Sequence, residues 1–128
     1  MLAYLMVGTT NVKRSAKFYD AALAPLGLVK THADNTSLGY GPKSAPKKSQ
    51  FFVTKPYNKK QATYGNGTMI ALTAKSKRAI DAFYAAALAN GGTDEGKPGP
   101  RPSSAVNYIA YVRDPDGNKI SAYCAKAK

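Results

Sequence analysis

The sequence predicts an α+β fold made of two βαβββ modules, residues 1–57 and residues 66–128. The main observation is an internal repeat: Phe18 to Gly27 aligns with Phe83 to Gly92 at an offset of 65 residues. A second is that each copy starts with a strand pattern followed by a helix pattern. A third is the length, because 128 residues suit one domain with one core. We therefore expect residues 1–128 to form a single domain.

The first strand and helix of each copy match in detail. At the same offset, Tyr4 to Val7 aligns with Met69 to Leu72, and Asn11 aligns with Ser76. Asn and Ser are good N-cap residues, and each stands just before a helical pattern. The first pattern runs to Leu26, after which a glycine favours the end of the helix. Matching caps and strands favour a duplicated unit over chance similarity between two Ala-rich helices.

Short extended segments follow each helix. The expected strands are residues 28–33, 37–40 and 50–55 in the first module, and 93–97, 106–113 and 119–124 in the second. Asp116-Gly117 predicts a hairpin between the last two. Residues 41–49 and 56–67 read as loops, the second joining the modules. Three prolines exclude residues 96–104 from a central strand and predict a flap over the open end of the sheet.

Composition excludes several classes of protein. Nineteen Lys and Arg against seven Asp and Glu give a net charge of +12, but no basic run exceeds two residues. This scatter disfavours sequence-specific nucleic-acid binding. The apolar stretches are too short to cross a bilayer. The lone Cys124 excludes an intramolecular disulfide, and no basic segment precedes the first apolar run, so we expect a cytoplasmic protein.

Three segments carry a resemblance to a known family: Val7 to Asp20, Gly67 to Ala74 and Asp114 to Cys124. They resemble the glyoxalase, bleomycin-resistance and extradiol-dioxygenase superfamily, also called vicinal oxygen chelate proteins. The Asp-Pro-Asp-Gly-Asn turn is the most specific piece, and the similarity runs from end to end. The resemblance implies two βαβββ modules whose sheets curl into an open barrel around a pocket, in a homodimer.

The resemblance also implies where a metal would be held. Enzymes of this family bind a divalent metal with His and Glu side chains on inward strand faces and use it as a Lewis acid. The matching positions here are Tyr4, Phe52, Met69 and Ser121. None of these four is a usual ligand of a transition metal. We therefore expect neither a metal nor a cofactor.

Two other potential ligands are expected to be ordinary surface groups. His32, the only histidine, is predicted to lie in a polar turn between two early strands. Glu95, the only glutamate, stands next to Asp94 and is predicted to form a solvated pair with it in a loop. No residue is assigned a catalytic role.

Alternation along the strands predicts a pocket instead. Its inward-facing side chains would be Tyr4, Met6, Gln50, Phe52, Met69 and Ser121. This set is mostly apolar, with a phenol, an amide and a hydroxyl to orient a small ligand. The net charge favours a neutral or anionic ligand over a cationic one. The alternative for these residues is that they only fill the interior of the barrel.

Two further functions stay open. One is an enzyme of the lactoylglutathione-lyase or dioxygenase type with a non-standard site, either a displaced metal or acid–base chemistry by Tyr4, whose phenol would need a cationic neighbour. The other is a nonspecific binder of nucleic acid or of an acidic partner through the lysine-rich surface.

Overall fold

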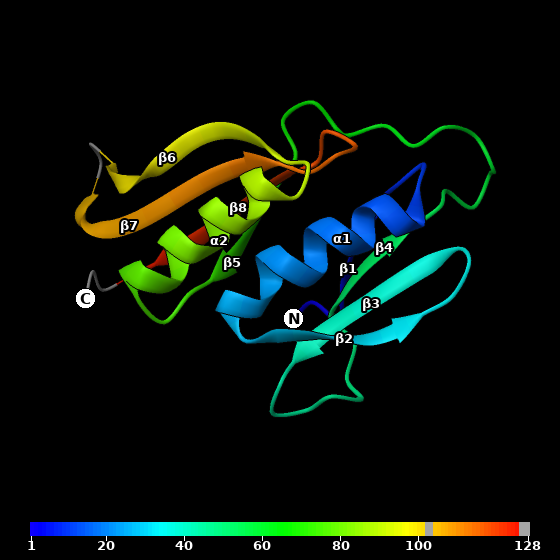
Figure 1. The fold of residues 1–128 in the computed structure, drawn as a ribbon, viewed down its shortest axis with the longest axis horizontal. Coiled ribbons are helices and arrows are strands. Elements are labelled where there is room, and N and C mark those ends of the chain that lie inside the picture. Colours follow the sequence, from blue (N-terminus) through cyan, green and yellow to red (C-terminus); the bar gives the residue numbers. More distant parts are fainter. Residues whose placement is uncertain (102–103, 126–128) are drawn as a thin grey trace.

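Two four-stranded mixed sheets, each with a helix on one face, make up the computed structural model (Figure 1). It describes the backbone of residues 1–101 and 104–125, and the side chains of all of these except 104–107. The elements are β1 (Leu5–Gly8), α1 (Val12–Leu23), a 3-10 helix (Ala24–Leu26), β2 (Leu28–Ala33), β3 (Ser37–Pro42), β4 (Phe51–Thr54), β5 (Met69–Thr73), α2 (Lys77–Ala89), β6 (Thr93–Arg101), β7 (Ser104–Arg113) and β8 (Lys119–Cys124). The predicted duplication of a βαβββ pattern is confirmed.

The sheets have the same topology. Their strand orders are β1-β4-β3-β2 and β5-β8-β7-β6. In each sheet the first strand pairs in parallel with the last strand of its module, with Leu5 opposite Phe51 and Met69 opposite Lys119. The other pairs are antiparallel. The two sheets remain separate and do not close into a barrel, so each offers an open face opposite its helix.

The predicted caps start both helices. The Asn11 side chain accepts a hydrogen bond from the backbone N–H of Arg14, and Ser76 Oγ accepts one from Ala79 N at 3.1 Å. The first α-helix ends at Leu23, three residues before the end of the predicted helical pattern at Leu26. The last three residues, Ala24–Leu26, form the 3-10 helix. Pro25 explains the change, because it has no N–H to continue the α-helical ladder.

The core lies between the helices and the sheets. In Figure 1, α1 and α2 run side by side in front of the strands. Phe18 and Tyr19 of α1 and Ile80 and Phe83 of α2 are fully buried in one cluster that includes residues of both sheets. Buried residues alternate along the strands, as in Phe51 and Val53 of β4, which leaves the residues between them on the open face. None of the described helices combines the length and apolarity needed to span a membrane.

The turn from Asp114 to Asn118 forms the predicted hairpin and also reaches the other module. Gly117 has φ +90°, which favours glycine, and its N–H donates to Asp114 O at 2.9 Å. Tyr19 of α1 donates its hydroxyl proton to Asp114 Oδ2 at 2.5 Å. Asn118 Nδ2 donates to Gly8 O at 2.9 Å. The turn therefore joins the two halves of the chain.

Three local predictions are wrong. Residues 93–101 form the edge strand β6 with bulges instead of leading into a flap, and residues 102–103 of the predicted flap lie outside the described residues. An edge strand tolerates prolines because their missing N–H groups need no partner. His32 lies within β2 and not in a turn, with Nε2 at 2.9 Å from Asp34 Oδ2. Its side chain is exposed, so the prediction of a surface group is confirmed. Glu95 lies in β6 and pairs with Arg113 Nε at 2.7 Å instead of forming a solvated pair with Asp94.

Candidate functional site

Four of the six predicted pocket residues gather on the first sheet. Met6 of β1 is the register partner of Phe52 of β4, and the Tyr4 ring makes an edge contact with the Phe52 ring, with 5.2 Å between centroids. Gln50 directly precedes β4, and its backbone carbonyl accepts from Leu5 N. The alternation rule thus placed Met6 and Phe52 on the same face, as the register confirms.

The other two predicted residues lie on the second sheet. Met69 stands opposite Lys119, and Ser121 stands opposite Ala71. Ser121 is fully buried, and its hydroxyl oxygen has no hydrogen-bond partner among the described residues. Since the sheets do not close into a barrel, one chain does not enclose all six predicted residues in a single cavity.

The apolar side chains on the open faces are not packed as core. The exposed fractions are 55% for Tyr4, 53% for Met6 and 41% for Met69, whereas the core residues on the helix side are nearly fully buried. Tyr4 and Met6 lie on or beside the first sheet and Met69 lies on the second. Exposed apolar side chains of this size are typical of a surface that contacts a ligand or another chain.

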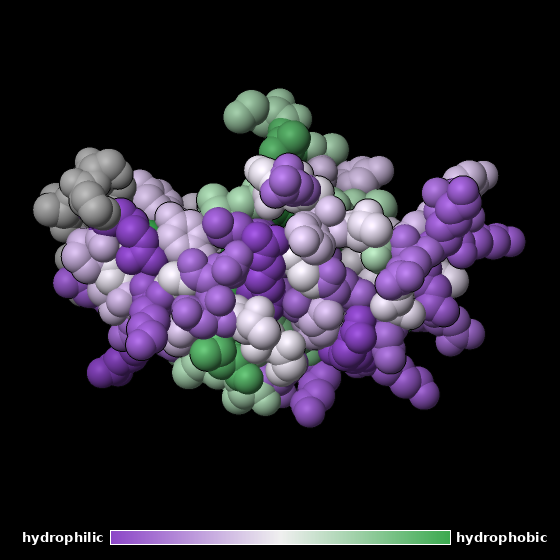
Figure 2. Space-filling model, turned by 90° about the horizontal axis from the view of Figure 1, so that it is seen from above, coloured by the Kyte–Doolittle hydropathy of each residue, from purple (hydrophilic) through white to green (hydrophobic). Residues whose placement is uncertain are grey.

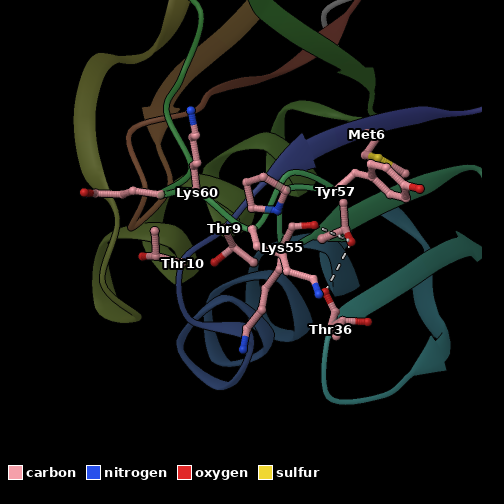
Figure 3. Close-up of a pocket in the computed structure, with 11 residues that line it drawn as sticks. Met6, Thr9, Thr10, Thr36, Lys55, Tyr57 and Lys60 are labelled. Atoms are coloured by element: carbon pink, nitrogen blue, oxygen red, sulfur yellow. Dashed lines mark hydrogen bonds between the residues drawn. The ribbon is translucent and has the colours of Figure 1, made fainter.

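A cavity of about 810 Å³ opens where β1 and β4 end (Figure 3). Because β1 and β4 are parallel, their carboxyl ends meet at the same edge of the sheet. The lining residues are Met6, Thr9, Thr10, Thr36, Thr54, Lys55, Pro56, Tyr57, Lys59, Lys60 and Gln61. Only Met6 belongs to the predicted set. The cavity is within the size range of small-molecule sites.

One wall of the cavity is a tight turn that follows β4. Thr54 Oγ1 donates to Thr36 O or to Lys55 O, each at 3.2 Å, which fixes the end of the strand. The Lys59 N–H then donates to Pro56 O at 2.9 Å, and Lys59 itself has φ +64°. A left-handed conformation is uncommon for lysine, so this turn is held by its hydrogen bonds against its local preference.

The ammonium groups along this wall are uncommitted. Lys55, Lys59 and Lys60 are exposed, and none of them takes part in an ion pair within the described ranges 1–101 and 104–125. Two carboxylates lie near the cavity, and each already has partners. Asp116 forms an ion pair with Arg14. Asp34 accepts hydrogen bonds from the backbone N–H groups of Thr36 and Ser37.

The two carboxylates are held ionised by their surroundings. Hydrogen bonds from Thr36 and Ser37 lower the pKa of Asp34 well below its ordinary value. Burial acts to raise the pKa of Asp116, but hydrogen bonds from Thr9 and Thr10 and the charge of Arg14 outweigh it, and the pKa is lowered.

A smaller cavity of about 320 Å³ lies between the start of β1 and the end of β5. Its lining combines residues of both sheets: Leu2, Ala3, Tyr4, Leu5, Leu26, Leu28, Tyr40, Gln50, Phe51, Leu72 and Thr73. It brings Tyr4 and Gln50 of the predicted set together in a largely apolar setting. Its lining contains no charged side chain.

The residues at the positions where the family resemblance places metal ligands do not fit a transition metal. Tyr4 and Phe52 on one sheet, and Met69 and Ser121 on the other, offer a phenol, a phenyl ring, a thioether and a hydroxyl. Zinc, nickel and iron require several imidazole, thiolate or carboxylate donors that converge. Within the part of the chain that the structure describes, no three His, Cys, Asp or Glu side chains cluster to hold a metal.

Sequence reasoning missed the cationic wall. Residues 56–67 are predicted only as a loop that joins the modules. The available signal is Lys55 at the end of the predicted strand 50–55, followed within five residues by Tyr57, Lys59 and Lys60. These residues could be placed beside the end of β1 only once the parallel pairing of β1 with β4 was known, and this pairing is a property of the folded sheet.

The model of the Glyoxalase/Bleomycin resistance protein/Dioxygenase superfamily matches residues 1–122. No curated protein matches the chain. Among solved structures, the chain is similar to a glyoxalase/bleomycin resistance protein from Albidiferax ferrireducens T118, with 42% identity and a TM-score of 0.85, covering 97% of this chain and 98% of that one.

More distant structures share the fold. A putative glyoxalase from Bacillus halodurans is 17% identical with a TM-score of 0.75, covering 97% of this chain and 95% of that one. A glyoxalase-related enzyme from Fulvimarina pelagi is 16% identical with a TM-score of 0.72, covering 94% and 86%. At this identity the likeness concerns the fold alone.

Proposed function

Because the chain belongs to the Glyoxalase/Bleomycin resistance protein/Dioxygenase superfamily, we propose that it uses this fold to bind a small neutral or anionic molecule without a metal. In this proposal the metal ligands of the family's enzymes have been replaced by Tyr4, Phe52, Met69 and Ser121. The open faces of the sheets, with Met6 and Gln50, contact the ligand.

The observation that carries the proposal is the 810 Å³ cavity beside the exposed Met6 side chain. Its lining joins the apolar side chains of Met6 and Pro56 to threonine, lysine and glutamine side chains that can orient a ligand.

We also propose that the protein is a homodimer in which the open sheet faces of two chains meet. β1 and β5 are edge strands, and Tyr4, Met6 and Met69 are exposed on or beside them. Light scattering coupled to gel filtration tests this, with twice the 13.6 kDa chain mass as the expected result. Met69→Lys should give the chain mass instead. Leu88→Lys, on the exposed side of α2, is the matched control and should leave the dimer intact.

A thermal-shift screen of aromatic acids, thiol conjugates and antibiotics tests ligand binding. Nuclear magnetic resonance of methyl-labelled methionine then locates each hit, because the chain has only three methionines. Ligands in the large cavity should shift the Met6 signal, and ligands on the second sheet should shift that of Met69. A screen without a single stabilising compound, repeated at several pH values, contradicts the proposal.

Two measurements separate this proposal from the alternatives. Elemental analysis of the purified protein should give no stoichiometric transition metal, and finding one would favour a metal enzyme with a displaced site. A gel-shift titration with duplex DNA should show binding, if any, that collapses as salt rises and lacks sequence preference. Tight binding that resists physiological salt would favour a nucleic-acid function.

A further inference from the structure

We propose that the 810 Å³ cavity is an anion site, in which Lys55, Lys59 and Lys60 attract the charged group of an organic acid while Met6 contacts its apolar body. The ligand class is a small organic molecule with a carboxylate, sulfonate or phosphonate group. This inference rests on the proposed binding function and adds the chemical class of the ligand and the part of the structure that selects it.

The half of the chain that supplies every lining residue of the cavity carries the larger share of the positive charge, which favours an anionic ligand. Residues 1–64 contain ten Lys and Arg against two Asp, a balance of +8, whereas residues 65–128 contain nine against five acidic residues, a balance of +4. Figure 2 shows hydrophilic side chains projecting from the end of the molecule that carries the first sheet. A concentration of one sign of charge around a cavity raises the local concentration of oppositely charged ligands.

The lysines border the cavity on more than one side. In Figure 3 the side chains of Lys55 and Lys60 extend in opposite directions, and Thr9 and Thr10 lie between them. The cavity is thus rimmed by positive charge and offers no single rigid contact. Lysine binds as a flexible point charge, in contrast to the planar fork of arginine. We therefore expect the cavity to prefer anionic ligands over neutral ones, and to accept anionic groups of different shapes.

The hydroxyl groups of Thr10 and Thr36 are already engaged, which leaves the three ammonium groups and the exposed Tyr57 hydroxyl as free donors of the cavity. Thr10 Oγ1 donates to Asp116 Oδ1 at 3.1 Å, and Thr36 Oγ1 donates to Asp34 Oδ1 at 3.0 Å. These two carboxylates bond lining residues but do not themselves line the cavity. Asp116 is paired with Arg14 at 2.7 Å, and Asp34 lies 2.9 Å from His32 Nε2. Even if Asp34 is counted as uncompensated, one carboxylate against three ammonium groups that are unpaired among the described residues leaves an excess of positive charge.

A matched pair of dyes tests the inference on the full-length protein. Anilinonaphthalene sulfonate is an aromatic anion, and phenylnaphthylamine is its neutral counterpart without the sulfonate. We expect the anion to bind about tenfold more tightly, from three exposed charge contacts, and to shift the Met6 methyl signal. Raising sodium chloride from about 20 mM to about 300 mM should remove most of this preference in the unmodified protein.

The variant with Lys55→Gln, Lys59→Gln and Lys60→Gln should bind both dyes equally. Its matched control carries Lys43→Gln, Lys47→Gln and Lys48→Gln, which removes the same charge from an exposed loop outside the cavity and should keep most of the preference. Unchanged Met69 and Met1 methyl signals verify that each variant is folded.

The possible outcomes separate the inference from the function on which it rests. Equal binding of the two dyes with a shifted Met6 signal overturns the anion selectivity and leaves small-molecule binding intact. If the two triple variants lose the preference for the anionic dye equally, net charge alone attracts the dye, and the anion selectivity of the cavity is also overturned. A shift of Met69 without Met6 overturns the location. The binding function itself fails only if the broader thermal-shift screen is also negative.

Discussion

Arg14 Nη2 lies 2.7 Å from Asp116 Oδ1, in an ion pair that connects the first helix of one module to the last turn of the other. The Asp116 side chain is 4% exposed. The same carboxylate accepts from Thr9 Oγ1 at 2.7 Å and from Thr10 N at 2.9 Å. Asp116 thus occupies the N-terminal end of α1, where backbone N–H groups and the helix dipole favour a negative charge.

Asp116→Asn should destabilise the protein by about 2 kcal/mol at neutral pH, because charge-assisted bonds to a buried carboxylate are lost. Urea unfolding measures the change. The pKa of Asp116 is lowered in the folded protein, so its contribution is present above its ordinary value and disappears as pH falls through the lowered pKa. The effect of Asp116→Asn should therefore fade in acid.

A double-mutant cycle between Arg14→Gln and Asp116→Asn should give a coupling free energy of about 1 kcal/mol. Lys30→Gln is the control, because the Lys30–Asp20 pair is largely exposed and should contribute less than about 0.5 kcal/mol. Equal losses from Asp116→Asn and Lys30→Gln would contradict the proposed joining role of Asp116.

Tyr19→Phe should lower the free energy of unfolding by about 2 kcal/mol at neutral pH, because it removes the hydroxyl that donates to the buried Asp114 carboxylate. Burial raises the pKa of Asp114, while the hydrogen bond from Tyr19 acts to lower it. Without that bond the pKa rises further, so the cost should be largest where Asp114 is ionised and should shrink as pH falls and Asp114 is protonated.

Unfolding curves at a series of pH values measure the effect of Tyr19→Phe. Tyr40→Phe is the control, since Tyr40 donates to Asp20, whose side chain is 46% exposed and hydrated. A loss on Tyr19→Phe that does not change with pH would show that the hydroxyl contributes only through packing.

Ser121→Ala should be neutral or stabilise the protein by up to about 1 kcal/mol, because it removes a buried hydroxyl that has no partner among the described residues. Ser15→Ala is the matched comparison: Ser15 is equally buried, but its hydroxyl lies 2.6 Å from Thr9 Oγ1, so about 1 kcal/mol should be lost. Thermal unfolding compares the two. A clear loss on Ser121→Ala would reveal a structural bond at that hydroxyl.

Asp34→Asn should reduce the sensitivity of the protein to acid. The pKa of Asp34 is lowered by the N–H groups of Thr36 and Ser37, so its contribution to stability is present above the ordinary value of 3.8 and is lost as pH falls below it. The variant should be less stable than the parent at neutral pH and should approach it in acid. Asp81→Asn removes one negative charge while leaving this turn intact, and serves as the control.

The duplicated fold could be predicted because its signals are local. Asn11 and Ser76 mark the helix starts, and alternation puts Met6 and Phe52 on the same face. The edge position of β6 could not be predicted, because prolines such as Pro98 fit a loop and an edge strand equally well. The position of a strand in a sheet depends on its partners along the chain.

The candidate site was predicted only in part, for a similar reason. Of its lining, only Met6 follows from strand alternation, because the cavity forms where Thr9, Thr36 and Lys55 meet from three separate segments. The Asp-Pro-Asp-Gly-Asn turn was predicted as a hairpin, whereas the partners of its side chains lie about a hundred residues away. Such contacts depend on how the two modules pack.

That separation along the chain has a consequence for the folding kinetics. Arg14 and Asp116 are 102 residues apart, and Tyr19 and Asp114 are 95 apart, so their bonds close nearly the whole chain into a loop. Closing so long a loop is costly in entropy, and such contacts are expected to form after the local strand and helix units. Weakening them should therefore accelerate unfolding more than it slows refolding. The turn from Asp114 to Asn118 is therefore expected to affect the unfolding rate of the protein more than its folding rate.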